Sequence, residues 1–322
     1  MEELTVSELK IISLNDIESK EVEWLWKPYI PLGKLTIIEG DPGSGKTMLA
    51  LQLASQLSNG VTLPFFEEHK EPMNIIYQTV EDSYDDTIKP RLEKMLGNYA
   101  NIHFIDESKD FLYMSDERIE QAIIRTNAKL LVLDPVQSYL GANVNMNSAN
   151  EVRSALNNLV EIAKRTECAI VIISHLNKKQ GLKAINKHIG SMDLAATARS
   201  VLLVGEIKGQ EGKRAMAHVK SSLCRKGKTL EFEITDNGFI WHGESELTEE
   251  EILAGVAQKT KKQIAMDFIE EMLVDGPRTP EEIYKKGTIY NISKRTIDEA
   301  KKVLNVKSVR LGTGWYWQIN ND

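Results

Sequence analysis

"IIEGDPGSGKTMLALQLASQLSNG", from Ile37 to Gly60, joins a short apolar run to a glycine-rich loop and then to a long amphipathic stretch. The loop fits the P-loop pattern Gly-x-x-x-x-Gly-Lys-Thr, with a strand expected before it and a helix after it. Glycines let backbone N–H groups turn inward around phosphate oxygens, and the helix N-terminus favours an anion. A plain glycine-rich turn is the simpler interpretation, but the flanking strand and helix favour nucleotide binding.

The loop therefore predicts a site for ATP and Mg²⁺. The residues expected to hold the nucleotide are Gly40, Asp41, Pro42, Gly43, Ser44, Gly45, Lys46, Thr47 and Met48. The Lys46 ammonium is expected to reach the β- and γ-phosphates, and the Thr47 hydroxyl to ligate Mg²⁺. In "LLVLDP" an apolar strand ends at Asp134. An Asp that ends a strand is usually a turn former, but downstream of a P-loop we favour a second Mg²⁺ ligand.

A water-activating base has to come from another strand, because Pro135 rather than an acid follows Asp134. "NIIYQTVEDS" brings Glu81 and Asp82 to the carboxyl edge of the sheet, where ligands bind in α/β folds. Glu81 is the predicted general base. The alternative is that Glu81 and Asp82 only cap the following helix.

A third strand, in "AIVIISHLNKK", ends at His175. A lone His after a strand is more often a structural hydrogen-bonding residue. If this strand neighbours the strand of Asp134, however, His175 faces the γ-phosphate or its water. A neutral imidazole there could report the nucleotide state to the next loop, so we predict a sensor role.

Apolar runs alternate with helical patterns along the rest of this region. Buried strands are expected at 34–39, 74–79, 130–133, 169–174 and 201–204. Helices are expected at 46–58, 84–96, 116–126 and 151–166, with Pro90 kinking or dividing the second. This alternation predicts an α/β fold with a mainly parallel sheet covered on both faces. The runs 215–223, 230–235 and 239–243 then predict antiparallel strands at its end.

Composition narrows the class of protein. With 42% apolar residues among 322, the chain can build a full core, and no stretch approaches the length of a transmembrane helix. The acidic N-terminus lacks the features of a signal peptide, and Cys168 and Cys224 show no metal or disulfide spacing. We therefore expect a cytoplasmic protein that has no contact with a membrane.

The charge is unevenly distributed. Residues 259–322 hold 12 Lys and Arg against 9 Asp and Glu, a net +3, which leaves −10 for the rest of the chain. The sequence therefore predicts four regions: a lead at 1–22, an ATPase core at 23–245, a linker or bridging helix at 246–261 and a small basic domain at 262–322.

Taken in order, the motifs resemble one family. "WLWKPYIPLGKLTIIEGDPGSGKT", "IIYQTVEDS", "LLVLDPVQSYL", "ISHLNKK" and "IGSMDLAATARSVLLV" are similar to the motifs of RepA-like hexameric replicative ATPases of the RecA/DnaB superfamily. The resemblance covers 24–243. It implies a RecA-like core that assembles into a ring, with ATP sites between subunits and Glu of the "ED" pair as the base.

The same resemblance implies residues that act from a neighbouring subunit. The family's trans-acting arginine finger falls on Arg199, where it would neutralise charge developing on the γ-phosphate. An ordinary surface arginine is the alternative. A lysine that reaches across the interface in relatives falls on Lys220, but some relatives place an arginine two residues later, where this chain has Ser222. Arg225 is a possible substitute, so the contact from this strand stays open.

In RecA-like rings, the loops after the strands ending at Asp134 and His175 line a channel for single-stranded DNA. The second loop, "NKKQGLKAINKHIGS", offers the candidate DNA-binding residues Lys179, Lys183 and Lys187, with Lys178 and His188 beside them. Lysines there could pair with phosphates without reading bases. A solvated loop is the alternative.

The C-terminal segment reads as three helices followed by a β-hairpin. Thr279 caps the second helix and Ser293 the third. This pattern resembles the winged-helix tails attached to some phage and mobile-element ATPases. Its third helix would present Lys294, Arg295, Lys301 and Lys302 to duplex DNA. A winged helix that docks on protein is the alternative, because Asp298 and Glu299 dilute the basic face.

These observations together predict an ATP-hydrolysing, oligomeric, DNA-associated motor, expected to be a hexamer that acts in replication of a phage or mobile element. The alternative is a regulatory, ATP-dependent DNA-binding switch that recruits a partner without translocating. A P-loop kinase is disfavoured, because His175, Arg199 and the basic tail would then have no role.

Overall fold

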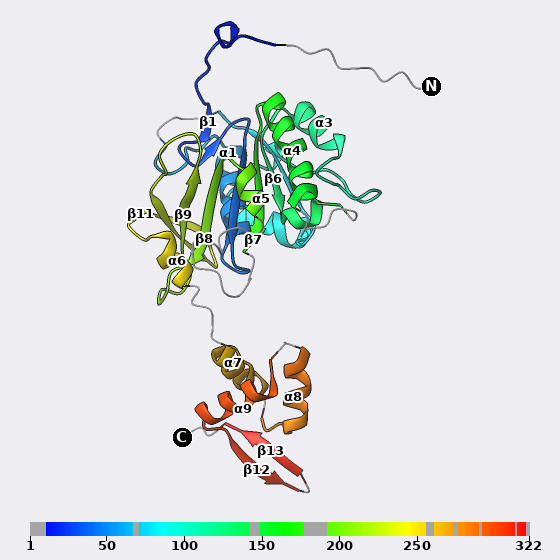
Figure 1. The fold of residues 1–322 in the computed structure, drawn as a ribbon, viewed down its shortest axis with the longest axis vertical. Coiled ribbons are helices and arrows are strands. Elements are labelled where there is room, and N and C mark those ends of the chain that lie inside the picture. Colours follow the sequence, from blue (N-terminus) through cyan, green and yellow to red (C-terminus); the bar gives the residue numbers. More distant parts are fainter. Residues whose placement is uncertain are drawn as a thin grey trace. The chain divides into compact units, whose positions relative to one another are not determined.

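The structure is a computed structural model, and it describes residues 11–66, 71–141, 149–176, 192–255, 261–273, 276–289, 292–312 and 314–319. The chain divides into two compact units, 1–255 and 256–322, which are coloured blue to yellow and orange to red in Figure 1. The division falls inside the predicted linker 246–261. Within that span Glu249–Gly255 forms helix α6, which packs on the larger unit through buried Ile252. The polar sequence of this segment conceals the apolar residue that anchors it.

The larger unit is built on a sheet that has nine strands among the described residues, in the order β11-β10-β9-β8-β3-β7-β6-β4-β5. The strands are β3 (Leu35–Gly40), β4 (Asn74–Thr79), β5 (Ile102–His103), β6 (Ala128–Asp134), β7 (Ala169–His175), β8 (Ser200–Glu206), β9 (Lys213–Ser221), β10 (Thr229–Thr235) and β11 (Gly238–Ser245). The P-loop strand β3 lies between β7 and β8 and runs parallel to both. Strands β9, β10 and β11 continue the sheet in antiparallel fashion, as the sequence predicts.

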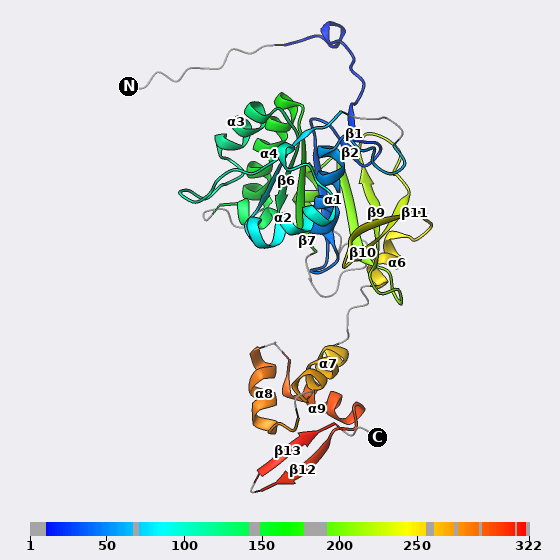
Figure 2. The ribbon, with the colours of Figure 1, turned by 180° about the vertical axis from the view of Figure 1, so that it is seen from behind.

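Helices cover both faces of this sheet (Figures 1 and 2). On one face α1 (Lys46–Ser58) and α2 (Lys89–Lys94) pack into a core that contains Leu49, Leu53 and Leu92. On the other, α3 (Glu117–Thr126), α4 (Ala149–Thr166) and α5 (Met192–Thr197) cover a second core that contains Ile119 and Leu159. The observed layers confirm the predicted α/β class. Nearly continuous burial along β3, β6 and β7 explains why their sequences are apolar without alternation.

The details that differ from the prediction are short elements. The helix expected at 84–96 is a π-helical turn, η2 (Tyr84–Ile88), followed by α2, with Pro90 in the first turn of α2 where its missing N–H is tolerated. The sequence did not reveal β5 or the small sheet of β1 (Trp24–Trp26) and β2 (Ile30–Pro31). The single-turn elements η1 (Leu14–Asp16), η3 (Tyr99–Asn101) and η4 (Val136–Tyr139) complete the unit.

The smaller unit contains α7 (Lys261–Leu273), α8 (Pro280–Ile289) and α9 (Lys294–Val303), followed by the antiparallel strands β12 (Lys307–Leu311) and β13 (Gly314–Gln318). Both predicted helix caps are present. The Thr279 hydroxyl accepts from the N–H of Glu282, and the Ser293 hydroxyl accepts from the N–H of Thr296. Ile269, Ile297 and Trp317 are buried in its own core. In the described parts of the chain, no helix is long and apolar enough to cross a membrane.

Candidate functional site

The carboxyl ends of the parallel strands gather the predicted nucleotide-binding residues, with Glu81 and His175, at one end of the sheet. Gly40 at the end of β3 pairs in register with His175 at the end of β7, and Thr79 at the end of β4 pairs with Asp134 at the end of β6. The P-loop follows Gly40 directly, and Glu81 lies two residues beyond Thr79. Strand register therefore places the P-loop, Glu81, Asp134 and His175 together, as the sequence predicts for an open α/β sheet.

Lys46 begins α1 and is buried against the loop that precedes it. Its Nζ donates to the backbone oxygens of Gly40, at 2.9 Å, and Asp41, at 2.8 Å. Burial lowers the pKa of Lys46 to about 8, partly opposed by the charges of Asp134, Asp41 and Glu81. A buried ammonium that donates to carbonyl oxygens is stabilised further by a bound polyphosphate, so the site suits that ligand electrostatically.

Asp134 is held by two hydroxyl donors. Its Oδ2 accepts from Thr47 Oγ1 and from the hydroxyl of Tyr77, each at 2.7 Å. Burial raises the pKa of this carboxyl, whereas the two hydrogen bonds and Lys46 oppose the rise. Mg²⁺ prefers oxygen ligands, and a carboxylate beside a P-loop hydroxyl supplies two groups of that kind. Thr47 and Asp134 therefore fit the predicted metal role.

The two acids after β4 are in different surroundings. Asp82 forms an ion pair with Arg91 at 2.7 Å on α2. Glu81 is exposed, yet its charge acts on both Lys46 and His175. The structure thus engages Asp82 with α2, whereas the charge of Glu81 acts on the lysine of the P-loop and on His175.

His175 is half-buried beside the P-loop. Burial and the nearby Lys46 cation lower the pKa of His175, against the opposing charges of Glu81, Asp134 and Asp41. Its imidazole is therefore neutral at neutral pH. Its Nδ1 is buried and has no hydrogen-bond partner within the described residues. A neutral ring with an unused polar atom leaves the sensor role as a prediction, to which the burial and position of His175 are suited.

Three residues of this edge are absent from the sequence-based prediction. Tyr77 supports Asp134 from the buried strand β4, and its only signal is a polar aromatic inside an apolar run. Glu39 precedes the P-loop, is 3% exposed, and has its pKa raised to about 8 by burial. Its sequence position indicates only the end of a strand.

Arg214 is the third, and it forms a wall of the loop together with Ile234. A Cβ added to Gly45 would lie 2.7 Å from Cδ of Arg214 and 2.8 Å from Cδ1 of Ile234. Gly45 also has φ +95, which only glycine adopts readily, so both space and backbone require glycine there. Strands β9 and β10 thus close the P-loop on the side away from β7.

The predicted trans-acting residues lie at the opposite end of the strands, away from the P-loop. Arg199 immediately precedes β8, and its backbone N–H donates to the carbonyl of Leu35 at the start of β3. Because β8 has seven residues, Arg199 is roughly 20 Å from the edge that carries the P-loop. Arg199 is exposed, and within one chain it does not approach the phosphate-binding loop.

Lys220 has a local role in this chain. Its Nζ donates to the carbonyls of Ala195, at 2.6 Å, and Ala198, at 2.8 Å, and so closes the end of α5. Burial, and then the charge of Arg199, lower its pKa. Lys220 therefore fixes the turn that presents Arg199, a function that the sequence did not suggest.

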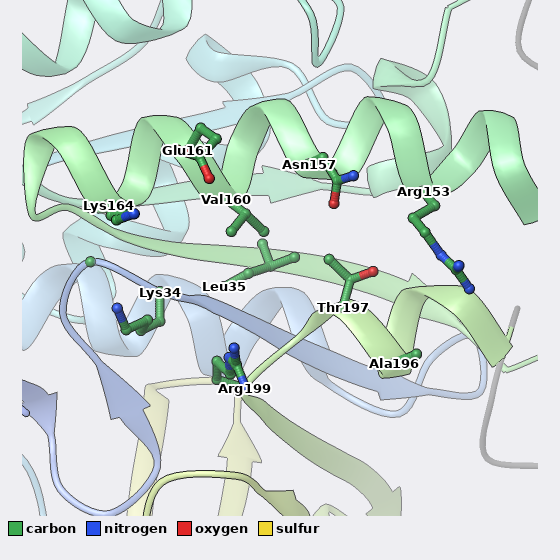
Figure 3. A pocket seen from close by; sticks show the side chains of 11 residues that line it. Lys34, Leu35, Arg153, Asn157, Val160, Glu161, Lys164, Ala196, Thr197 and Arg199 are labelled. Atoms are coloured by element: carbon green, nitrogen blue, oxygen red, sulfur yellow. The ribbon is translucent and has the colours of Figure 1, made fainter. Parts of the chain in front are cut away.

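A pocket of about 560 Å³ lies beside Arg199, between α4 and the start of β3. Figure 3 shows Arg153, Asn157, Glu161 and Lys164 along α4, with Lys34 and Arg199 on the other side. Four of the side chains around it are cationic and one, Glu161, is anionic. The pocket is therefore strongly basic.

The candidate DNA-binding residues fall in two groups. Lys179, Lys183 and Lys187 lie outside the described residues. On α9, Lys294 stands over the Tyr284 ring at 4.7 Å, Lys301 stands over the Trp317 ring at 4.3 Å, and Arg295 pairs with Glu299 at 3.0 Å. Lys302 is exposed. The basic face of α9 is present, and three of its cations already have contacts within the unit.

Three comparisons relate this chain to known proteins. The family model described as "AAA domain" matches residues 2–181. DNA repair protein RadA of Bacillus subtilis (strain 168) is 30% identical over 149 residues, 46% of this chain and 29% of RadA. RadA of Halalkalibacterium halodurans is 28% identical over 166 residues, 51% of this chain and 32% of that protein. The chain thus matches about a third of the length of these curated relatives. A KaiC-like protein from Pyrococcus horikoshii OT3 superposes with a TM-score of 0.49 at 19% identity, over 69% of this chain and 99% of that one.

Proposed function

Because this chain belongs to the AAA domain family and is a P-loop ATPase, we propose that it is an oligomeric, DNA-associated motor of the RepA type that hydrolyses ATP between neighbouring copies. One observation carries the proposal. Lys46, Glu81, Asp134 and His175 share one edge of the sheet, whereas Arg199 lies at the other. If Arg199 acts on a nucleotide, that nucleotide belongs to another copy.

The described residues suit distinct parts of the reaction. The P-loop amides and Lys46 would hold the phosphates, and Thr47 and Asp134 would hold Mg²⁺, which supplies charge neutralisation when bound. Glu81 would orient the attacking water and accept its proton. Arg199 of the next copy would offset charge that develops on the γ-phosphate oxygens. His175, neutral and half-buried, would pass the state of the site to the loop that follows it.

DNA association rests on separate support. RadA relatives carry the name of DNA repair proteins, and the C-terminal unit has the three helices and hairpin expected of a winged helix. Duplex would bind through α9, and single-stranded DNA through residues 177–191 of the core. We propose a role in replication of phage or mobile-element DNA, on the resemblance to RepA-like ATPases.

The ATPase rate with and without single-stranded DNA tests this function. A motor that tracks a strand should hydrolyse ATP several-fold faster when the strand is present. The alternative, a switch that binds ATP and recruits a partner, predicts slow turnover that single-stranded DNA leaves unchanged. Unstimulated turnover by assembled protein would decide for the switch.

A further inference from the structure

An acidic turn follows β4 at the nucleotide edge. We define it as Glu81, Asp82, Asp85 and Asp86, four carboxylates within six residues. Asp85 and Asp86 are exposed at the start of η2, where Asp85 accepts from the Ser83 hydroxyl at 2.6 Å. Hydrogen bonds from Ser83 and the local backbone lower the pKa of Asp85 and keep it ionised. Because Asp82 is balanced by Arg91 on α2, the negative charge of the turn rests on Glu81, Asp85 and Asp86, all three of which are exposed.

The basic pocket of Figure 3 is its counterpart in charge. Lys34, Arg153, Lys164 and Arg199 surround it, with Glu161 as the one acid in the lining. Lys34 is carried by the turn before β3, Arg199 by the turn before β8, and Arg153 and Lys164 by α4. The four cations are therefore carried by backbone that belongs to the main sheet and to the longest described helix.

One chain cannot bring these two surfaces together. The acidic turn leads into η2 and α2, whose Ile88 and Leu92 pack into the core on the α1 side of the sheet. The pocket lies on the other side, where Leu156 and Leu159 of α4 are buried. Figures 1 and 2 show α2 and α4 on opposite faces. Two different complementary surfaces on opposite faces of one chain suit a head-to-tail contact, which closes into a ring or extends as a filament.

We propose that the acidic turn of one copy docks in the basic pocket of the next. The inference rests on the proposed assembly and names the surfaces that form it. It also links assembly to activity, because the acidic turn begins at Glu81 and the pocket includes Arg199. The contact that joins two copies would therefore deliver Arg199 to the neighbour's nucleotide edge.

Charge reversal tests the docking without touching the predicted catalytic residues. The turn variant carries Asp85→Lys and Asp86→Lys, and the pocket variant carries Arg153→Glu and Lys164→Glu. Assembly is followed by sedimentation velocity with a non-hydrolysable ATP analogue over a range of protein concentrations. Each variant alone should need about tenfold more protein, or a higher excess, for half-assembly, since like charges then face each other. A 1:1 mixture should recover wild-type assembly, because each reversed surface now meets its opposite.

Matched controls keep the result interpretable. Arg125→Glu with Lys208→Glu reverses two exposed cations that lie outside the pocket lining, and it should assemble like wild type. Asp85→Asn with Asp86→Asn should weaken assembly less than reversal does. Circular dichroism establishes that each variant is folded.

The outcomes separate this proposal from the broader one. A wild type that stays monomeric with nucleotide would overturn both the oligomeric motor and the docking. A wild type that assembles, with variants that assemble equally well or a mixture that fails to recover, overturns the docking alone. If the pocket variant assembles normally but loses affinity for a labelled oligo-dT, the occupant is nucleic acid and the proposal is wrong.

Discussion

The Asp134 carboxylate is positioned by hydrogen bonds within the chain itself. Thr47 and Tyr77 both donate to its Oδ2. Burial raises the pKa of Asp134, and the nearby Lys46 cation opposes that rise. The lysine in turn satisfies its own charge on loop carbonyls. Each group is held in place by partners that a nucleotide and Mg²⁺ can replace or share.

Substitution of two residues separates binding from turnover. Lys46→Ala should abolish tight ATP binding, because it removes the buried cation at the loop. Glu81→Gln should keep ATP binding but slow hydrolysis by about 10² or more, the usual scale for loss of a general base. Equilibrium binding of a fluorescent ATP analogue and steady-state phosphate release measure the two effects. Normal turnover by folded Glu81→Gln would remove Glu81 from the mechanism.

Glu39 makes stability depend on pH in a predictable direction. Its folded-state pKa of about 8 lies above the ordinary value of 4.5, so the folded protein favours the protonated form. The stability associated with that proton is complete below pH 4.5 and is lost as pH rises toward 8. Glu39→Gln mimics the neutral acid. From pH 5 to pH 8, the free energy of unfolding of wild type should therefore fall by on the order of 3 kcal/mol relative to that of Glu39→Gln.

Urea unfolding at several pH values measures this difference, with the exposed Glu211→Gln as the matched control. The control should follow wild type at every pH. Parallel curves for Glu39→Gln and wild type would show that Glu39 ionises normally in the folded protein.

Among the elements, the parallel strands could be predicted because a strand that is buried on both faces has a continuous apolar sequence. Strand β4 and helix α1 have the predicted bounds. The residues that act through three-dimensional contact could not be found this way. Tyr77 contacts Asp134, and Arg214 approaches the P-loop, only because of the order of the strands in the sheet, which the sequence does not give. Lys220 likewise donates to the end of α5 from a strand that is distant in sequence. The sequence of α6 fits a linker as well as a helix, because charged residues surround its buried residue Ile252.

The C-terminal helix α9 carries the next prediction. Its cations and the net positive charge of 259–322 contrast with the acidic remainder of the chain. Removal of residues after 255 should therefore weaken duplex binding strongly and preserve basal ATPase activity, because every proposed nucleotide residue precedes the cut. Each cation that no longer pairs with a DNA phosphate should lower the salt slope of log affinity by about 0.9.

Titration of a labelled duplex at several salt concentrations, with full-length and truncated protein, measures the effect. The quadruple variant Lys294→Ala, Arg295→Ala, Lys301→Ala and Lys302→Ala tests α9 within the complete chain. Unchanged duplex affinity in both would favour a winged helix that docks on protein.

For the whole molecule, the decisive feature is the distance between the two ends of the parallel strands. Glu81 and Arg199 belong to one chain but lie at opposite ends of the parallel strands. The proposed reaction therefore requires two copies, each contributing one of the two residues. This arrangement also predicts that activity per chain rises with protein concentration until assembly is complete.

Mixing two inactive variants tests this requirement directly. Arg199→Ala retains Glu81, and Glu81→Gln retains Arg199, so some contacts in a mixed assembly pair both intact residues. If the two variants are randomly arranged at 1:1, roughly a quarter of the sites should be complete, and the ATPase rate should recover in proportion. Arg199→Ala mixed with the double variant Arg199→Ala/Glu81→Gln is the control and should stay inactive. Recovery toward a quarter of the wild-type rate is the predicted result, and no recovery in mixtures shown to co-assemble would contradict it.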